Sequence, residues 1–521
     1  MKENNSEINN IDNINNDMQN STEDYFNDLF SFSKTEKMPD NVIKNLKINH
    51  SFLITFINPN SGPRQGVTIL DYVESFKCKA ILNYKIISFP LQNINLGQYS
   101  SSLSSNLSEF SSIFFNILNK EEIQTGIKFI KKYISCFPDK QIKILIGGGD
   151  GSTVRFLEEL INDEVNLSKC IFGTIPIGTG NDLSNSLGFG GEIKIDGILS
   201  LQNLLYKYIN ATPTKLDIWE INVKLDEHNG YIYDYDDSKK LKIGDFKRSF
   251  VNYFSIGYDA RIGFIFEPKR TSFRFYNKCI YGMEGFKRFI CCKKNYGMTE
   301  LFESFQEEIP NPELMNKKNK EGTITDYSDI EEVKTDPLLI KDEKENLVGG
   351  NRKVIFKTKN SGNISSNIIL KGNPISIICQ NIFYYMGGTK NIWTNSSNLG
   401  ITPENATKNE FNQYKKDIFD NFQVQSYNDK KLEILVYENA IEEGLEKITK
   451  GMGKRIYQGT GPFYFKFKNN TFNTENNEIG NIYLNLDGEY YHLENVIEIS
   501  VRINTNICGG QLNFVKNYNF Q

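Results

Sequence analysis

Histidine and closely spaced cysteines are scarce in this sequence. The 521 residues include three histidines, and the eight cysteines are scattered without a single Cys-x-x-Cys pair. A structural zinc site needs four Cys or His ligands, which usually come in close pairs. The composition therefore argues against zinc-binding modules, and reduced thiols are the simplest interpretation of the cysteines.

Long apolar runs and an excess of positive charge are also missing. No run of 18 apolar residues occurs, so no transmembrane helix is expected. The first 20 residues are rich in Asn and lack the apolar core of a signal peptide. The net charge of −4 gives no sign of a nucleic-acid binder. We therefore expect a cytoplasmic protein that binds no nucleic acid.

The chain is long enough for two or three domains. Residues 1–45 are rich in Asn, Asp and Glu, which predicts a disordered tail. Residues 46–205 alternate apolar strands with helical patterns, such as the isoleucine spacing over 121–136, which predicts an α/β domain. Residues 206–521 contain many strands rich in Tyr, Phe, Ile and Val, which predicts a β-sandwich domain.

Three polar segments interrupt these patterns. Residues 92–119 are rich in Ser and Asn, and residues at about 226–248 and 295–370 are polar or charged without a period. We expect all three to be surface insertions, the longest of them disordered.

A glycine-rich turn, 147-GGGDGST-153, lies between an apolar strand and a helical pattern. Glycines let the backbone approach a ligand, and a helix that begins near Thr153 would direct its N–H groups at a phosphate. Asp150 would repel that phosphate unless a cation lies between them or the carboxylate accepts a proton. The alternative is a glycine turn in which Asp150 only caps the helix.

Two further turns have the same character. They are 58-NPNSGPRQG-66 and 176-PIGTGNDLSNSLGFGG-191, and both follow apolar strands. The carboxyl ends of parallel strands meet at one edge of a sheet, where α/β proteins bind ligands. Because no Walker motif is present, the three turns predict phosphate chemistry without a P-loop.

The chain resembles the eukaryotic diacylglycerol kinases, within the wider group of lipid kinases and NAD kinases that share a GGDG turn. The resemblance rests on eight segments in order: 57-INPNSGPRQG-66, 147-GGGDGS-152, 176-PIGTGNDLSNSLGFGG-191, 216-LDIWEI-221, 252-NYFSIGYDARIGFIFE-267, 277-NKCIYGMEG-285, 380-QNIFYYMGG-388 and 486-LDGE-489. It implies an α/β nucleotide-binding domain followed by a β-sandwich-like domain, with the active site in the cleft between them. The implied reaction transfers the γ-phosphate of ATP to diacylglycerol, with Mg²⁺, and gives phosphatidic acid.

The resemblance also implies roles for individual residues. Asp150, Asp182 and Asp217 would form a Mg²⁺–water network, and the alternatives are a helix cap for Asp182 and an edge-strand carboxylate for Asp217. Asp487, with Glu489 behind it, resembles the base that faces the lipid hydroxyl, and Asp150 is the rival base. By itself the Asp-Gly pair at 487 is an ordinary hairpin signal. The nucleotide would be bound by Asn58, Ser61, Gly147, Gly148, Gly149, Gly151, Ser152, Gly178, Thr179, Gly180 and Asn181.

The sequence departs from the family pattern in two respects. The family usually has Thr and then an aromatic residue in the first glycine turn, where this chain has Ser152 and Arg155. Ser152 retains the hydroxyl, whereas Arg155 puts the local packing in question. The Cys/His-rich C1 modules are absent, so we expect no diacylglycerol sensing through them.

A membrane surface is the expected partner, because the implied substrate is a lipid. Residues 264–294 interleave eight Lys or Arg with aromatic residues, which suits docking on anionic headgroups. The alternative is a solvated helix face with its aromatic residues in the core. We expect a peripheral membrane protein, and a homodimer stays open.

Three other functions stay open at this stage. A sphingoid-base or ceramide-type lipid kinase would share the same turns. An NAD kinase would share the GGDG turn but usually has Asn-Glu after a second glycine turn, where this chain has 180-GND-182. A catalytically silent lipid-binding scaffold is the non-enzymatic alternative, and Arg155 is its only support.

Overall fold

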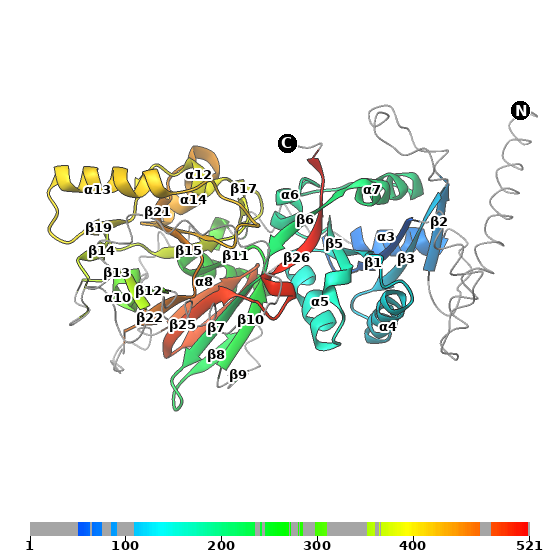
Figure 1. The fold of residues 1–521 in the computed structure, drawn as a ribbon, viewed down its shortest axis with the longest axis horizontal. Helices are drawn as coiled ribbons and strands as arrows, with labels where there is room; N and C mark the ends of the chain where they lie inside the picture. Colours follow the sequence, from blue (N-terminus) through cyan, green and yellow to red (C-terminus); the bar gives the residue numbers. More distant parts are fainter. Residues whose placement is uncertain are drawn as a thin grey trace, which may run out of the picture. The chain divides into compact units, whose positions relative to one another are not determined.

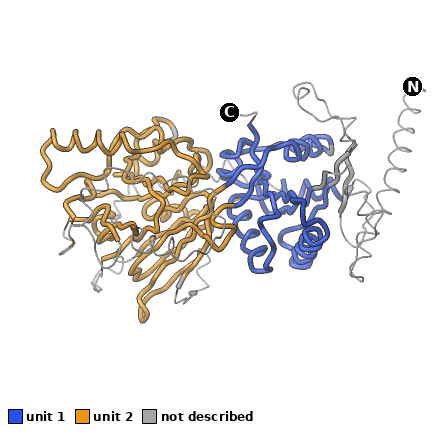
Figure 2. The backbone as a smooth tube through the Cα atoms, viewed as in Figure 1, with its two compact units in different colours: residues 1–215, 512–521 blue, residues 216–511 orange. Residues whose placement is uncertain are grey.

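The computed structural model describes two compact units, residues 1–215 with 512–521 and residues 216–511 (Figure 2). The expected tail at 1–45 lies outside the described residues. No helix in the described part is long and apolar enough to cross a membrane. The residues described are 51–62, 65–75, 85–90, 109–234, 240–241, 245–269, 271, 280, 282–284, 297–309, 352–359, 364, 366–468 and 481–518.

The first unit is built on a seven-stranded sheet with the strand order β2-β3-β1-β4-β5-β26-β6. Strands β3, β1, β4, β5 and β26 run parallel, and β2 pairs with β3 in the antiparallel direction. The strands are β1 Ser51–Ile57, β2 Lys85–Pro90, β3 Glu109–Asn116, β4 Ile142–Gly148, β5 Cys170–Pro176, β6 Thr212–Asp217 and β26 Gln511–Lys516. The helices are α3 Gln65–Ser75, α4 Lys120–Cys136, α5 Asp150–Asn162, α6 Asp182–Ser186 and α7 Ile198–Asn210.

Helices cover both faces of this sheet (Figure 1). On one face, residues of α3 and α7 join a buried cluster with Leu53, Leu145 and Ile175 of the strands. On the other, Phe156 of α5 packs against Phe56 of β1 with ring centroids 4.1 Å apart. A parallel sheet buried on both faces needs nearly continuous apolar strands, which explains the runs that predicted this domain.

The observed elements differ from the expected ones in two places. Part of 92–119, expected as an insertion, is strand β3 in the sheet. The C-terminal strand β26, expected in the second domain, pairs with β5 of the first unit. Sheet pairing between segments distant in sequence leaves no local periodic signal, so neither strand could be assigned from the sequence. The helix expected over 121–136 is confirmed as α4.

Lys143 lies near the start of β4, at the opposite end of the strand from the glycine turn, and binds the C-terminal end of helix α7. Its ammonium group donates hydrogen bonds to the carbonyl oxygens of Tyr208, Ile209 and Ala211, at 3.3 Å for Tyr208 and 3.4 Å for Ala211. These bonds satisfy carbonyl groups that the helix itself leaves without donors. Burial lowers the pKa of Lys143 to about 8.

A pH titration of unfolding should detect this lysine. Between about pH 8 and 10.5 the unfolded chain retains the Lys143 proton that the folded chain has lost, so stability rises with pH in this window. We expect the unfolding free energy of the native chain, relative to Lys143→Met, to rise by up to about 3 kcal/mol across it. The exposed Lys128→Met is the control, and equal slopes for all three proteins would contradict the assignment.

The second unit contains two large sheets. The eight-stranded sheet, in spatial order, is β10 Asp245–Phe250, β7 Trp219–Leu225, β25 Val496–Ile503, β22 Phe463–Phe467, β12 Phe302–Glu308, β13 Arg352–Lys357, β14 Ile368–Leu370 and β19 Ile401–Pro403. The nine-stranded sheet is β18 Asn398–Leu399, β21 Lys454–Gly459, β20 Leu432–Tyr437, β15 Ser376–Gln380, β11 Tyr253–Gly257, β23 Asn481–Leu486, β24 Glu489–Glu494, β8 Tyr231–Asp234 and β9 Lys240–Leu241.

One core joins these sheets, and shorter elements border them. Phe254 of β11 meets Phe465 of β22 edge-on, with ring centroids 5.8 Å apart, so side chains of the two sheets pack together as in a sandwich. The remaining elements are the hairpin β16 Tyr384–Tyr385 and β17 Thr389–Lys390, and the helices α8 Tyr258–Phe266, α10 Met298–Leu301, α12 Ile392–Asn395, α13 Lys408–Asn421 and α14 Ala440–Thr449.

The expected insertions of this unit are partly sheet. Strands β8 and β9 and the start of β10 lie within 226–248, and β12, β13 and β14 lie toward the ends of 295–370. Residues 310–351 lie outside the described residues. Strand β12 has two apolar residues and β13 has three, each among charged or polar ones, and these short apolar stretches were concealed by the polar composition of the surrounding segment.

Candidate functional site

Three turns of the first unit lie against one another at the carboxyl ends of β1, β4 and β5. The amide of Asn58, after β1, donates to the Gly147 carbonyl oxygen at 2.8 Å. The amide of Gly178, after β5, donates to the Gly148 carbonyl oxygen at 3.0 Å. The sequence predicts this convergence, and the structure brings the three turns together.

Two glycines allow this close contact. A Cβ on Gly178 would lie 2.2 Å from the Gly149 Cα, and a Cβ on Gly62 would lie 2.2 Å from the Ile177 carbonyl oxygen. Gly62 also has a positive φ of 66°, which favours glycine. Any side chain at either position would push the turns apart.

Side chains link the first two turns as well. The amide nitrogen of Asn58 donates to the Ser152 hydroxyl at 3.0 Å, and the Asn58 side-chain oxygen accepts from the Asn60 amide at 3.0 Å. The Ser61 amide donates to the Asn58 carbonyl oxygen at 3.1 Å. Asn58 and Ser152 therefore support the shape of the turns through each other.

Asp150 lies in the first turn of α5, because this helix begins three residues earlier than the expected Thr153. Its two carboxylate oxygens accept hydrogen bonds from the backbone amides of Asp182, at 2.9 Å, and Leu183, at 3.1 Å. These amides open helix α6, where a negative charge is stabilised. Asp150 thus caps a helix, but a different helix from its own, and it ties the first glycine turn to the second.

The second glycine turn is shaped by its own polar residues. Thr179 and Gly180 are half-buried in the turn after β5. Asn181 has a left-handed backbone with φ 58°, and its amide nitrogen donates to the carbonyl oxygens of Gly178, at 2.9 Å, and Gly191, at 2.7 Å. Asp182 is fully buried at the start of α6. Asn181 therefore closes the turn.

Asp217 is buried in the second unit. Its carboxylate accepts from the Lys430 amide at 2.5 Å and from the Gln511 side chain at 2.6 Å. Burial raises its pKa to about 7, against the opposing effect of these hydrogen bonds. In the described part of the chain, no three Asp, Glu, His or Cys side chains form a group that could hold a metal ion.

Asp487 occupies the turn of the β23–β24 hairpin with a left-handed φ of 50°. It is 3% exposed, and its oxygens accept the amides of Val251, Asn252 and Tyr253 at 2.8, 2.9 and 3.0 Å. Three buried donors stabilise the negative charge of the carboxylate. Glu489, at the start of β24, is half-buried and accepts from the Tyr491 hydroxyl at 2.9 Å.

Two side chains of the second unit were not singled out from the sequence. Asn252 is fully buried, and neither its amide oxygen nor its amide nitrogen has a hydrogen-bond partner among the described residues. A buried amide without partners is costly, so this position beside the Asp487 hydrogen bonds fits a bound polar group. Its place in the segment 252-NYFSIGYDA-260 was the available signal.

The second overlooked residue is Asp259, in the first turn of the same segment's helix α8. It is 2% exposed, and it accepts from the Tyr385 hydroxyl at 2.6 Å and from the Ser255 hydroxyl. Burial raises its pKa above the ordinary value, and the two hydroxyl donors partly offset this. Asp259 therefore joins 252-NYFSIGYDA-260 to 380-QNIFYYMGG-388, two of the segments that carried the family resemblance.

Two family models match this chain. Residues 53–208 match the diacylglycerol kinase catalytic domain, and residues 249–490 match the diacylglycerol kinase accessory domain. The first match includes the three turns, and the second includes Asn252, Asp259 and Asp487. Together they take in most of the chain.

Individual relatives agree with these matches. Diacylglycerol kinase iota of Homo sapiens is 31% identical over 245 residues, which are 46% of this chain and 19% of the relative. Diacylglycerol kinase eta of Mesocricetus auratus is 31% identical over 170 residues, 32% of this chain and 11% of the relative. Diacylglycerol kinase 4 of Arabidopsis thaliana is 27% identical over 301 residues, 51% of this chain and 52% of the relative. The chain thus spans about half of the plant relative and much less of the two mammalian ones, and with a catalytic and an accessory domain in that order it belongs to the diacylglycerol kinase family.

Proposed function

We propose that this chain transfers the γ-phosphate of ATP to the hydroxyl of diacylglycerol and so forms phosphatidic acid. The hydroxyl oxygen bonds to the γ-phosphorus, the bond from that phosphorus to the ADP oxygen breaks, and a base takes the hydroxyl proton. The observation that carries the proposal is the junction at Asp150, which joins two glycine turns inside the matched catalytic domain.

The glycine turns fit the phosphates of ATP. Helix α5 has 13 residues, and its N-terminus with Gly149 and Gly151 offers backbone amides and a favourable dipole to an anion. We assign the phosphates to the backbone of 147–152 and 178–180, with the Thr179 and Ser152 hydroxyl groups beside them. Asn58, Ser61 and Asn181 would keep the turns in this shape.

Magnesium would be held by few protein atoms. Mg²⁺ commonly takes one or two carboxylates and fills its shell with substrate phosphates and water. Asp150 and Asp182, at the glycine turns, suit direct or water-mediated contact. Asp217 is the third candidate for this network, and like those of Asp150 its oxygens already accept two hydrogen bonds. The ion would neutralise charge on the transferred phosphoryl group.

Two carboxylates are candidates for the base. Asp487 lies at the hairpin and accepts the backbone amide of Asn252, whose side-chain amide has no partner among the described residues, and Glu489 is two residues further on. Asp150 lies at the glycine turns. Because both have their oxygens engaged by backbone amides, substitutions that retain these hydrogen bonds must separate the roles.

The substrate places the reaction at a membrane surface. We propose peripheral attachment in the cytoplasm, with the basic and aromatic segment 264–294 near anionic headgroups. Most of this segment lies outside the described residues. Within it, Glu284 is 7% exposed and forms an ion pair with Lys269 at 2.9 Å.

A single assay tests the proposal. The full chain is given labelled ATP and Mg²⁺ with vesicles of diacylglycerol, with a sphingoid base, with ceramide, or with NAD. We expect label in phosphatidic acid alone. Label in another lipid or in NAD would replace the proposed substrate, and no label in any arm would favour a silent scaffold.

A further inference from the structure

Helix α14 (Ala440–Thr449) turns its aliphatic side outwards. Ile441, Leu445 and Ile448 are 49%, 38% and 78% exposed. Their spacing of four and three residues places them on one face of the helix. Such a face normally packs on the core of a soluble domain, so here its orientation is inverted.

The acidic residues of α14 lie on its inner side and bond to the domain. Glu446 is 3% exposed and accepts the amides of Gly451, Met452 and Gly453 at 2.7, 2.8 and 3.1 Å. The Glu443 carboxylate accepts from the Ser376 hydroxyl at 2.8 Å. These hydrogen bonds hold the helix in its orientation.

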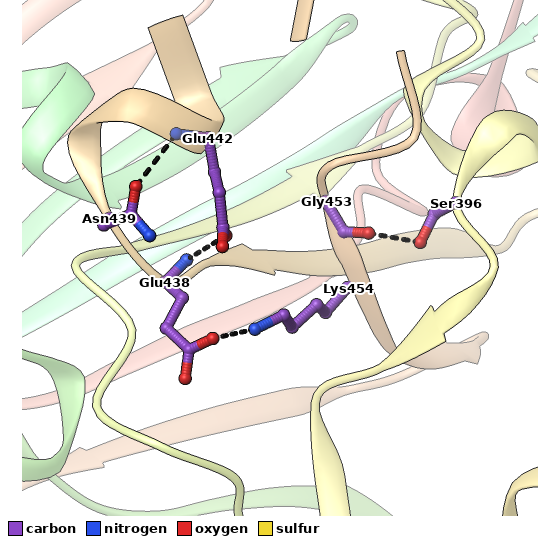
Figure 3. A network of polar contacts seen from close by, with 6 residues as sticks. All are labelled: Ser396, Glu438, Asn439, Glu442, Gly453 and Lys454. Atoms are coloured by element: carbon purple, nitrogen blue, oxygen red, sulfur yellow. Dashed lines mark hydrogen bonds and ion pairs between the residues drawn. The ribbon is translucent and has the colours of Figure 1, made fainter. Parts of the chain in front are cut away.

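The start of the helix is anchored in the same way, as Figure 3 shows. Asn439 caps it by accepting the Glu442 amide at 3.0 Å, and the Glu442 carboxylate accepts the Glu438 amide at 3.1 Å. Glu438 forms an ion pair with Lys454 of β21. Rotating α14 to bury its aliphatic side would break this network, so the exposed face belongs to the folded state.

Two exposed lysines lie beside this face, and the part-exposed Glu438 before the helix is ion-paired with Lys454. Glu442 and Glu443 are half-buried and Glu446 is buried, so no acidic residue of α14 is exposed. Lys450, directly after the helix, is exposed. Strand β17, which packs against α14, carries the exposed Lys390.

We propose that Ile441, Leu445 and Ile448 insert into the interfacial layer of a lipid bilayer, with Lys390 and Lys450 beside anionic headgroups. Apolar side chains flanked by lysine are what an interfacial helix presents to a membrane. A second copy of the chain fits this face less well. Three partly exposed aliphatic residues offer on the order of a few hundred Å², whereas a stable dimer buries roughly 800 Å² per partner.

The inference rests on the proposed function and names the face by which the accessory domain meets its substrate bilayer. The inner side of α14 is bonded to Ser376, which pairs with Gly257 of β11. Gly257 directly precedes Tyr258 and Asp259, and Asp259 is bonded to Tyr385. The proposed membrane face is thus fixed to segments that identify the family.

Vesicle binding without substrate tests the proposal apart from catalysis. The full chain is sedimented with vesicles of phosphatidylcholine and phosphatidylserine that contain neither diacylglycerol nor ATP. Glutamine in all three positions (Ile441→Gln, Leu445→Gln and Ile448→Gln) retains helix propensity, and we expect the partition coefficient to fall about tenfold or more. Leu199→Gln, at a 58% exposed position of α7, should leave it unchanged.

Fluorescence gives a second readout at a single position. The two native tryptophans, Trp219 and Trp393, are 0% and 1% exposed, so lipid should not reach them. Ile448→Trp should add a signal that brominated phosphatidylcholine vesicles quench, whereas Leu199→Trp should add one that they do not. Thermal unfolding of each variant checks that the fold is retained.

Three results would overturn the proposal: no vesicle binding by the native chain, equal binding of the glutamine variant, or no quenching of Ile448→Trp. If the native chain forms a dimer in light scattering and the glutamine variant does not, while both bind vesicles equally, the face contacts protein and not lipid. A native chain that binds vesicles through α14 but phosphorylates no diacylglycerol would refute the proposed function alone.

Discussion

Asp150→Ala should lower phosphoryl transfer by at least about a thousandfold, since it removes a charge from the reacting groups and the tie between two glycine turns. The amides of Asp182 and Leu183 would lose their acceptor at the start of α6. Each partly buried donor left without a partner costs about 1–3 kcal/mol. The steady-state rate on diacylglycerol vesicles and the free energy of unfolding are the two measurements.

A conservative variant separates the two effects of Asp150. Asp150→Asn retains one oxygen that can accept an amide of α6, so it should recover part of the lost stability. If the carboxylate reacts with the proton or binds the metal, turnover stays as low as in Asp150→Ala. If it only ties the turns, turnover recovers with stability.

The control for both Asp150 variants lies at the opposite end of α5. Asp163 accepts one exposed hydrogen bond from Gln124 at 2.9 Å, and Asp163→Ala should leave turnover within about twofold. An Asp150→Ala protein that keeps more than about a tenth of native turnover would contradict the proposed role. Loss of turnover in Asp163→Ala would show that α5 as a whole is sensitive.

In the first unit, the local sequence predicted the helices and turns better than the hydrogen-bond partners of their side chains. The turn around Gly147, the helix over 121–136 and the convergence of the glycine turns all follow from short-range patterns and from the geometry of parallel sheets. The partners of Asp150 do not, because its hydrogen bonds reach 32 and 33 residues ahead to the start of α6. The sequence shows that a carboxylate is placed at a turn, but not which backbone amides donate hydrogen bonds to it.

The second unit shows the same limit over longer distances. The Asp-Gly pair at 487 predicts a hairpin turn, and β23 and β24 form that hairpin. The backbone amides that Asp487 accepts lie 234 to 236 residues earlier in the chain. Likewise the outward face of α14 has the spacing of a core helix, and only the structure shows that Glu443 and Glu446, not this face, are bonded to the domain.

Asp487→Ala should destabilise the second unit strongly, because one carboxylate is the shared acceptor of three amides. The amides of Val251, Asn252 and Tyr253 would lose this acceptor in a buried place. At about 1–3 kcal/mol for each donor, we expect a loss of about 4 kcal/mol or more. Hydrogen exchange of these three amides reports the effect directly, and their protection should fall toward that of a locally open segment.

Asp487→Asn decides whether this residue is also the base. Asparagine tolerates the left-handed backbone at this turn and keeps an oxygen that can accept the Asn252 and Tyr253 amides, so the fold should survive with a smaller loss of stability. As a base, Asp487 cannot be replaced by a neutral amide, and single-turnover transfer should fall by about a hundredfold or more while ATP binding is retained.

The control is Glu494→Gln in the same hairpin, whose carboxylate accepts one hydrogen bond, from the Tyr233 hydroxyl at 2.9 Å. A folded Asp487→Asn protein with near-native transfer would make Asp487 a positioning residue and leave Asp150 as the proton acceptor.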